Sequence, residues 1–301
     1  MKSQKFLFTA FLLFSTFTIS CGSAVNSATE NSSSIQSSNQ KTPSTPKEFF
    51  NQAEDKVEQG DLIGAVYDYT QALQINPKYT QAYIARGLTH RKLKNYQQAI
   101  ADYNEAIIIN PKYAQVYNNR GLARYYLKDY QGAITDFNQA LKINPKLAIA
   151  YANRGLIYRN LKQYKKAIAD YDEAIKLNPK YALAYNNRGL ARSLLKDYQE
   201  AMADLNEAIK LNPQGANTFN NRGFVYTSLQ DYQKAVADFT QAIKIDSQNA
   251  LAYYNRGYIY QKLGNKSEAI ADFEQAANLY QEQGNQRSFQ NTLKRIEKLS
   301  Y

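Results

Sequence analysis

The sequence has very few of the residues from which enzymes and metal proteins build their sites. Its 301 residues include one cysteine, one histidine and no tryptophan. The single cysteine, Cys21, excludes an intramolecular disulfide and a metal site made of several cysteines. The sequence contains a 34-residue repeat, and the histidine, His90, stands at a position where other copies of the repeat have tyrosine or arginine. We therefore interpret His90 as a core or groove substitution. No Gly-rich phosphate loop, no metal-ligand spacing and no nucleophile beside a base is present. We therefore expect no catalysis, cofactor, metal or small-molecule substrate.

Acidic residues are fewer than basic ones, 26 against 37, which gives a formal charge of +11. The first 46 residues hold Lys2, Lys5 and Lys41 against Glu30, and removing their net charge of +2 leaves +9 on the rest. Helical-repeat proteins can bind RNA, but here the positive charges are spread along the chain instead of forming one block. We expect no nucleic acid as partner, and either a preference for acidic partners or simple solubility of a long surface.

Long apolar runs are absent except near the N-terminus. Two lysines precede an apolar run from Phe6 to Ile19, which is too short for a comfortable transmembrane helix and typical of an export signal. The following Thr18-Ile19-Ser20-Cys21-Gly22 resembles the lipobox of bacterial lipoproteins, in which the cysteine is lipidated. We predict a signal peptide at 1–20, lipidation of Cys21 and a Ser/Asn/Thr-rich disordered tether at 21–46. The alternative is an ordinary secretory signal with an incidental cysteine.

A period of 34 residues governs the remaining sequence. Glycine, the arginine before it and an aspartate about 16 residues after that arginine each recur at this spacing. The arginines and aspartates of this pattern are Arg86, Arg120, Arg154, Arg188, Arg222 and Arg256, and Asp68, Asp102, Asp136, Asp170, Asp204, Asp238 and Asp272. So strict a period predicts a stacked array of repeats.

Each unit carries two segments whose apolar residues recur at helical spacing. The segments are separated by a short stretch such as Leu127-Lys128-Asp129, where Asp129 is suited to accept hydrogen bonds from the N–H groups that open the second helix. An Asn-Pro pair, as at Pro145, ends the second helix, because proline excludes the helical conformation before it and lacks an N–H donor. Each unit is therefore predicted to be a helical hairpin.

The pattern of Tyr117, Gly121, Ala133, Phe137 and Pro145 in the third unit closely resembles the tetratricopeptide repeat, with Tyr or Phe in place of the family's usual Trp. The repeat region covers residues 47–283. Its seven units are 46–79, 80–113, 114–147, 148–181, 182–215, 216–249 and 250–283. The resemblance implies an all-α fold, a right-handed superhelical solenoid whose first helices line the concave side. Residues 284–301 place Phe289, Leu293 and Ile296 on one helical face, which predicts a capping helix. Its basic residues then form a solvated outer face or touch anionic lipid.

The repeated arginines and aspartates predict a structural ladder. An unpaired buried arginine is costly, and antiparallel packing brings Arg120 level with Asp136 in its own hairpin and Asp102 in the preceding one. We expect each arginine to lie between two aspartates and the ladder to fix the stacking register.

A second row suggests where a partner binds. Asparagine stands before five of the six Arg-Gly pairs, and a side-chain amide can pair with the backbone of an extended peptide; bonding within the fold is the equally weighted alternative. Basic and aromatic residues follow on the next turn in the N-terminal half. The expected peptide-binding residues are Asn119, Asn153, Asn187, Asn221, Asn255, Arg91, Tyr125, Tyr126 and Arg159. The family's clamp for C-terminal carboxylates is not expected, because Ile84, Leu88 and Asn118 occupy its positions.

Together, these expectations predict that the protein is a non-catalytic scaffold for protein–protein interaction. We expect it to be exported and lipid-anchored in a bacterial cell envelope, facing the periplasm, with the membrane unassigned. We expect its partner to be another protein or peptide, with a preference for acidic ones as an open alternative. Resemblance to envelope lipoproteins built from these repeats favours an adaptor. A structural assembly factor and a non-catalytic accessory subunit of an envelope enzyme remain as alternatives.

Overall fold

The computed structural model describes residues 43–300, and all of its helices belong to one compact unit, Thr42–Tyr301. The expected signal peptide, the lipidation site Cys21 and most of the expected tether lie outside the described residues. None of the described helices is long and apolar enough to span a membrane.

The described chain is entirely helical between its turns. Its fifteen helices are α1 (Pro46–Gln59), α2 (Leu62–Ile75), α3 (Thr80–Lys92), α4 (Tyr96–Ile109), α5 (Ala114–Tyr126), α6 (Tyr130–Ile143), α7 (Ala148–Asn160), α8 (Tyr164–Leu177), α9 (Ala182–Leu194), α10 (Tyr198–Leu211), α11 (Ala216–Ser228), α12 (Tyr232–Ile245), α13 (Ala250–Leu263), α14 (Lys266–Glu282) and α15 (Gln286–Ser300). Consecutive helices from α1 to α14 pair into seven hairpins, and α15 packs on α14. The predicted all-α solenoid is confirmed.

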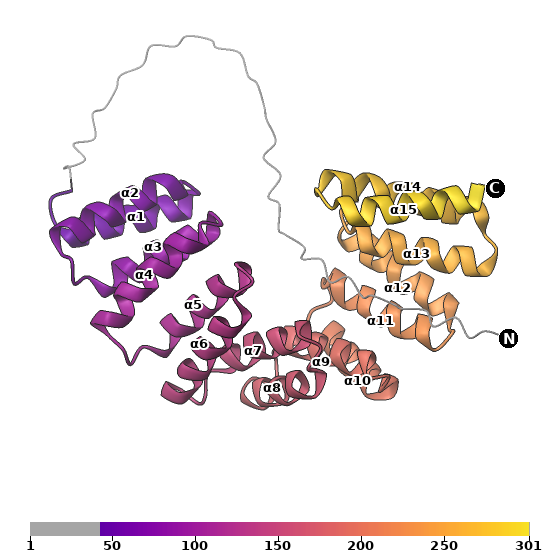
Figure 1. The fold of residues 1–301 in the computed structure, drawn as a ribbon, viewed down its shortest axis with the longest axis horizontal. Helices are drawn as coiled ribbons and strands as arrows, with labels where there is room; N and C mark the ends of the chain where they lie inside the picture. The colour runs from indigo at the N-terminus through magenta and orange to yellow at the C-terminus, as the bar shows by residue number, and fades with distance from the viewer. Residues whose placement is uncertain (1–42, 301) are drawn as a thin grey trace, which may run out of the picture. The chain divides into compact units, whose positions relative to one another are not determined.

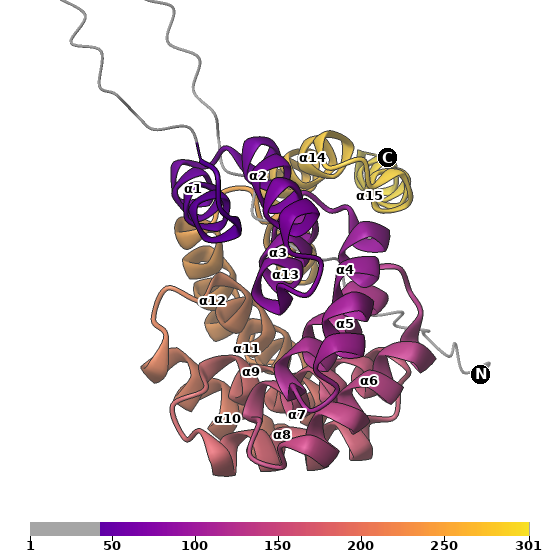
Figure 2. The same ribbon diagram turned by 90° about the vertical axis from the view of Figure 1, so that its left-hand side faces the viewer.

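The hairpins stack in sequence along a curve, as Figure 1 shows. In the middle of the array, the first helices α3, α5, α7 and α9 lie on the inner side of the curve, and the second helices α4, α6, α8 and α10 lie outside. Each first helix from α3 to α11 also contacts the next first helix, so these helices form a continuous inner layer. Viewed at right angles in Figure 2, successive hairpins change direction as the array advances.

Small residues let the two helices of a hairpin approach closely. Gly121 on α5 faces Phe137 on α6, and a Cβ added at Gly121 would lie 2.8 Å from the Phe137 ring. Ala133 and Ala140 on α6 are fully buried, Ala133 in a cluster with the Phe137 ring and Ala140 in a cluster with Tyr117. Any larger side chain at these positions would force the helices apart, because protein interiors have no spare volume. These residues therefore belong to the core of the hairpin.

The turn inside each hairpin uses a left-handed residue that the sequence did not reveal. Lys94, Lys128, Lys162, Lys196 and Gln230 have φ between 59° and 69°, while Gly60 and Gly264 take the same place in the first and last hairpins. Non-glycine residues are disfavoured there because Cβ crowds the carbonyl oxygen. The next residue caps the second helix only in some hairpins: Asp129 accepts from the Gly132 N–H at 2.9 Å, whereas Asn95 and Asp197 make no side-chain cap.

The two ends of the array are closed differently. At the N-terminal end, Glu48 and Asp55 are exposed at positions where later hairpins bury residues such as Val116 and Ala123 against the preceding hairpin. A capping box joins Thr45 and Glu48 there. At the C-terminal end, Phe289 of α15 packs on the cluster of Ala250, Ala276, Leu279 and Tyr280. The first hairpin therefore ends the stack with polar residues and the last with a covering helix.

Candidate functional site

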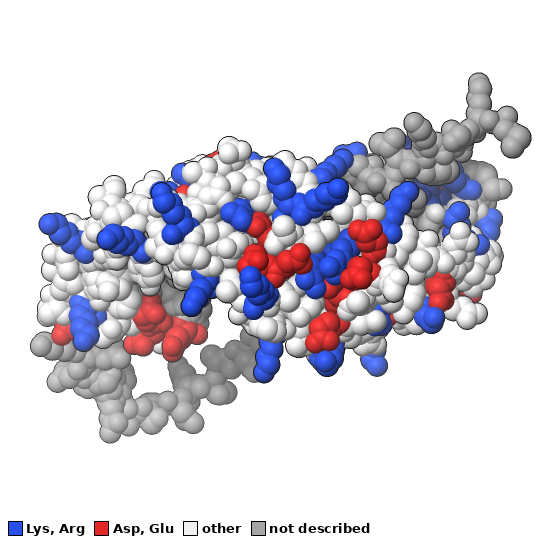
Figure 3. Space-filling view, turned by 90° about the horizontal axis from the view of Figure 1, so that it is seen from below, with Lys and Arg blue, Asp and Glu red and all other residues white. Residues whose placement is uncertain are grey.

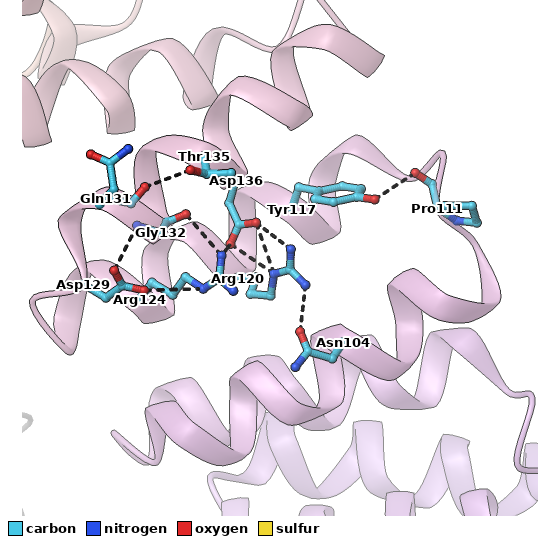
Figure 4. Close-up of polar contacts among 10 residues, drawn as sticks. All are labelled: Asn104, Pro111, Tyr117, Arg120, Arg124, Asp129, Gln131, Gly132, Thr135 and Asp136. Carbon is cyan, nitrogen blue, oxygen red and sulfur yellow. Dashed lines mark hydrogen bonds and ion pairs between the residues drawn. The ribbon is translucent and has the colours of Figure 1, made fainter.

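The seam between helices holds the repeated arginines and aspartates. Arg120 on α5 donates from Nε and Nη2 to the two carboxylate oxygens of Asp136 on α6, with the shortest distance 2.6 Å from Nη2 to Oδ1 (Figure 4). The Asp136 side chain is 2% exposed and that of Arg120 is 16% exposed. The same ion pair joins the two helices of hairpins two to seven, at Arg86–Asp102, Arg120–Asp136, Arg154–Asp170, Arg188–Asp204, Arg222–Asp238 and Arg256–Asp272.

The second repeated aspartate expected beside each arginine is not its partner in any of the six hairpins, and Arg188 alone meets another aspartate, Asp172, in its place. Arg120 reaches the preceding hairpin through Nη1, but its acceptor is Asn104 Oδ1 at 2.7 Å and not Asp102. Residues two apart on an α-helix point to nearly opposite sides, so Asp102, which is bound to Arg86, cannot also face Arg120. The acceptors in the preceding hairpins are Thr70, Asn104, Asn138, Asp172, Asn206 and Thr240. Only Arg188 lies between two aspartates.

The ladder has two further components that the sequence analysis missed. Each arginine lies over the aromatic ring three residues before it, as Arg120 does over Tyr117 with 5.4 Å from Cζ to the ring centroid. In the first hairpin, where Gln52 replaces the arginine, Lys56 pairs with Asp68 at 2.6 Å. Hydrogen bonding to Asp238 is the main cause that raises the pKa of Arg222. These guanidinium groups are therefore charged, paired and structural.

The asparagine row forms hydrogen bonds within the inner layer. Asn153 donates from Nδ2 to Asn118 Oδ1 at 2.9 Å, and Asn221 and Asn255 donate in the same way to the asparagines 35 residues earlier. Asn119 and Asn187 are 5% and 8% exposed. Burial takes these two out of direct reach of a ligand, which corrects the expectation that all five face one. Asn153, Asn221 and Asn255 are half-buried.

The basic and aromatic residues on the next turn are also drawn into the layer. Arg159, 6% exposed, donates from Nη1 to Asn187 Oδ1 at 2.9 Å, and the Tyr125 hydroxyl, on a side chain that is 4% exposed, accepts from Asn160 Nδ2 at 3.0 Å. Both contacts join one first helix to the next. The expected anchoring of a partner on Tyr125 and Arg159 therefore conflicts with their burial. Tyr126 is 43% exposed and stacks on Tyr96, and Arg91 is half-buried.

Burial, and not pairing with a catalytic partner, shifts the pKa values of titratable side chains in these hairpins. Burial lowers the pKa of His90, whose Nε2 is 4.0 Å from Asp102 Oδ2. Burial also raises the pKa of Tyr103 and of Tyr125 to about 12. Within residues 43–300, no group of His, Cys, Asp and Glu side chains is placed to hold a metal ion. These shifts are those expected of core residues.

Exposed apolar residues on the inner helices were not singled out from the sequence. Ile149 on α7 is 37% exposed and Leu183 on α9 is 55% exposed, although both belong to first helices. The available signal was their shared position, since they stand 34 residues apart. On the face over α8 and α10, lysine and arginine are interspersed with acidic side chains (Figure 3). No single basic block covers that face.

Models of the tetratricopeptide repeat match residues 80–113, 114–147, 148–181, 182–214 and 250–283, and a TPR repeat model matches residues 225–264. No curated protein matches the chain significantly.

Solved structures share the fold at low sequence identity. A tetratricopeptide repeat protein from Parabacteroides merdae is 24% identical, with a TM-score of 0.69 over 82% of this chain and 98% of that one. The structure of pilF from Pseudomonas aeruginosa is 17% identical, with a TM-score of 0.61 over 73% of this chain and 96% of that one. Yeast Tom70 is 18% identical, with a TM-score of 0.58 over 85% of this chain and 53% of that one.

Proposed function

Because this chain belongs to the tetratricopeptide repeat family, whose members bind other proteins, we propose that it is a non-catalytic scaffold that binds an extended polypeptide along its inner layer of first helices. The observation that carries the proposal is the unbroken contact from each of these helices to the next. An extended chain can follow such a surface across several hairpins, and each added hairpin adds contacts.

The chemistry of the layer suits a polypeptide. Asn153, Asn221 and Asn255 each use one amide N–H within the layer, while no described group donates to their side-chain carbonyl oxygens. A peptide N–H is a suitable donor for these acceptors. The exposed Ile149 and Leu183 offer apolar contact beside them. Backbone pairing with apolar side-chain contact is the usual basis for binding extended peptides.

Photo-crosslinking in cells tests this surface. A benzophenone amino acid placed at Ile149 or Leu183 is expected to form a discrete adduct with one partner. The matched controls carry it at Gln131 and Lys165, exposed residues of the second helices α6 and α8, and are expected to form none. Adducts that arise only from the control positions would place the partner on the outer layer and end the proposal.

Anchoring in a cell envelope is the second part of the proposal. It is supported by the lysines, the apolar run and the Thr18–Gly22 sequence that precede the tether, and not by the described structure. Lipidation of Cys21 would retain the scaffold at a membrane if at least two acyl chains are attached, because one chain alone binds a membrane only marginally and reversibly. Cys21→Ser is expected to move the protein from the membrane fraction to the soluble fraction. An unchanged distribution would favour the ordinary secretory signal and leave the peptide-binding proposal unaffected.

A further inference from the structure

A cavity of about 330 Å³ opens between the first two hairpins. Apolar walls come from α1 and α3, at Phe50, Val57, Ile84 and Leu88, and Arg91 and Lys92 lie at one side. We call this the hairpin 1–2 pocket. Its volume is at the small end of the range of about 300 to 1,000 Å³ that holds small ligands. It is therefore suited to one or two side chains and not to a folded domain.

Val57 borders the pocket and is a short side chain at its position, as are Ser193 and Thr227 in the fifth and sixth hairpins. At the same position of the third and fourth hairpins stand Tyr125 and Arg159. Those long side chains reach the next first helix, where they contact Asn160 and Asn187. Val57 cannot span that distance, so the space that a tyrosine or arginine fills later in the array is left vacant here.

The facing wall, on α3 of the second hairpin, lacks the amides that later first helices carry. Ile84 and Ala85 stand where the third hairpin has Asn118 and Asn119. Both replacements remove hydrogen-bonding groups from the pocket wall and leave hydrocarbon. Since apolar surface gains about 25 cal/mol for each Å² removed from water, the wall favours an apolar side chain over a polar backbone.

The charges around the pocket are unbalanced. Its one acidic residue, Glu54, already accepts a hydrogen bond from the Tyr69 hydroxyl. Within residues 43–300, neither Arg91 nor Lys92 has a carboxylate within ion-pair distance, in contrast to the six ladder arginines. The Nε atom of Arg91 is buried without an acceptor in hydrogen-bond geometry, although the Tyr103 hydroxyl lies beside this guanidinium. Arg91 as a whole is half-buried, and a carboxylate in the pocket would pair with the exposed part of its guanidinium, to which no carboxylate of residues 43–300 is bound.

We propose that the hairpin 1–2 pocket binds a leucine or phenylalanine side chain of the partner polypeptide, with an adjacent aspartate or glutamate paired to Arg91. The inference rests on the proposed function, because it names the sequence that one end of the inner layer recognises. The apolar side chain fills the space beside Val57, and the neighbouring carboxylate meets Arg91 at the pocket's edge. The rest of the polypeptide continues along the first helices.

The test uses the full chain, labelled at its Ile, Leu and Val methyl groups, and two synthetic peptides. One is acetyl-Ser-Thr-Phe-Asp-Ser-Thr-amide, and the other has Lys in place of Asp. The Asp peptide at millimolar concentration is expected to shift the methyl signals of Val57, Ile84 and Leu88 and to bind about tenfold tighter than the Lys peptide, since a charge-assisted pair replaces a like-charge contact.

Two variants, Val57→Tyr and Arg91→Ala, separate the contribution of the pocket from that of the charge, and Thr227→Tyr is the control. Val57→Tyr installs the side chain that the third hairpin carries at this position, and it is expected to weaken binding of the Asp peptide about tenfold or more. Thr227→Tyr, at the same position of the sixth hairpin, adds the same side chain outside the pocket and is expected to leave affinity unchanged. Arg91→Ala is expected to abolish the preference for Asp over Lys while the three methyl signals still shift.

The outcomes separate this inference from the proposed function. Peptide-induced shifts at Ile149 and Leu183 that persist in Val57→Tyr, with the pocket methyls unmoved, would overturn the pocket and retain groove binding. No shift anywhere at millimolar Asp peptide would also overturn the pocket, while the crosslinking test would still decide the proposed function. If decanoate shifts the pocket methyls and the peptide does not, the occupant is a fatty acyl chain, and the peptide inference is wrong.

Discussion

At the residue scale, the arginine ladder shows why paired charges recur inside this fold. Each ladder arginine has an aspartate in its own hairpin, a polar acceptor in the preceding hairpin and an aromatic ring on its own helix. One guanidinium thus connects three elements with fixed geometry. Buried ion pairs often add little net stability. We interpret the ladder as a device that sets the rotation of one hairpin on the next, which is the property a repeated binding surface needs.

Removal of one ladder carboxylate is expected to lower the free energy of unfolding far more than removal of a carboxylate on the surface. Asp136 accepts from both Arg120 and Arg124, the latter at 2.8 Å. Asp136→Asn leaves Arg120 without its charge partner and Arg124 with only Asp129, at 3.8 Å, so we expect a loss of about 3 kcal/mol in the free energy of unfolding. Glu173→Gln, in the exposed pair with Lys176, is the control, with an expected change below about 0.5 kcal/mol. Urea unfolding followed by far-ultraviolet circular dichroism measures both, and equal losses would contradict the structural role.

Burial of tyrosines predicts a loss of stability at high pH. The pKa of Tyr103 and of Tyr125 is raised from 10.0 to about 12, chiefly by burial. Since the unfolded chain loses these protons first, their contribution to stability is complete below about pH 10 and disappears as the pH rises to about 12. We expect the free energy of unfolding to fall through this window. In titrations of tyrosinate absorbance, Tyr103→Phe and Tyr125→Phe should each remove one late-titrating group; removal of a group that titrates near pH 10 would show that the ring is accessible to water.

At the scale of the helical hairpin, the turn carries strain that the terminal hairpins avoid. Lys128 has φ of 65° at the position where Gly60 and Gly264 occur in other hairpins. Lys128→Gly should relieve the contact between Cβ and the backbone, although glycine also loses more freedom on folding. We expect a gain of roughly 0.5 to 1 kcal/mol in the free energy of unfolding.

The matched control for this turn is Lys142→Gly in the last turn of α6, where glycine is expected to cost up to about 1 kcal/mol. Opposite signs for the two variants, measured by thermal and urea unfolding, would establish the strain. A loss of stability in Lys128→Gly would show that the lysine side chain contributes more at the turn than its backbone conformation costs.

At the scale of the whole molecule, the 34-residue period was sufficient to predict the fold. Periodicity places Gly121, Ala133 and Phe137 on facing helices whatever their surroundings, because the spacing of apolar residues depends only on the helix. The details of the seam were harder to predict. Whether Arg120 meets Asp102 or Asn104 depends on the rotation of one hairpin on the next, and residue spacing within one helix carries no such information.

The sequence of a single repeat was also insufficient to predict which side chains of the inner layer are buried. Asn119 and Arg159 look like surface residues in the sequence, yet both are buried. Arg159 is covered because its side chain lies against the next first helix, where it donates to Asn187. The short side chain of Val57 indicates the hairpin 1–2 pocket only by comparison with Tyr125 and Arg159 at the same position of later hairpins. Those two residues form hydrogen bonds to the next first helix. A difference between repeats was therefore more informative about binding than the pattern that they share.

A destabilising change in the capping helix α15 can show how many hairpins lose stability together. Phe289 of α15 covers Leu279 and Tyr280, and Arg295 lies over the rings of Tyr254, Tyr258 and Phe273 at 5.1 to 5.7 Å from their centroids. This corrects the sequence-based assignment of Arg295 to a solvated face: cation–π contact and its hydrogen bond to Gln261 hold it inward. Both side chains thus join α15 to the last hairpin.

Phe289→Ala is expected to lower the stability of the C-terminal end by about 1 to 3 kcal/mol, because it opens a cavity over the last hairpin. In a stack where each hairpin contacts mainly its neighbours, the effect should fade with distance. Hydrogen exchange measured by mass spectrometry should therefore accelerate in α13 to α15, less in α11 and α12, and not in α1 to α4. Ser267→Ala, an exposed change on α14, is the control and should alter none of these. If exchange instead accelerates equally in all seven hairpins, the array unfolds as one cooperative unit, and a partner bound at α1 and α3 would then stabilise α15 as strongly as it stabilises the hairpins that it touches.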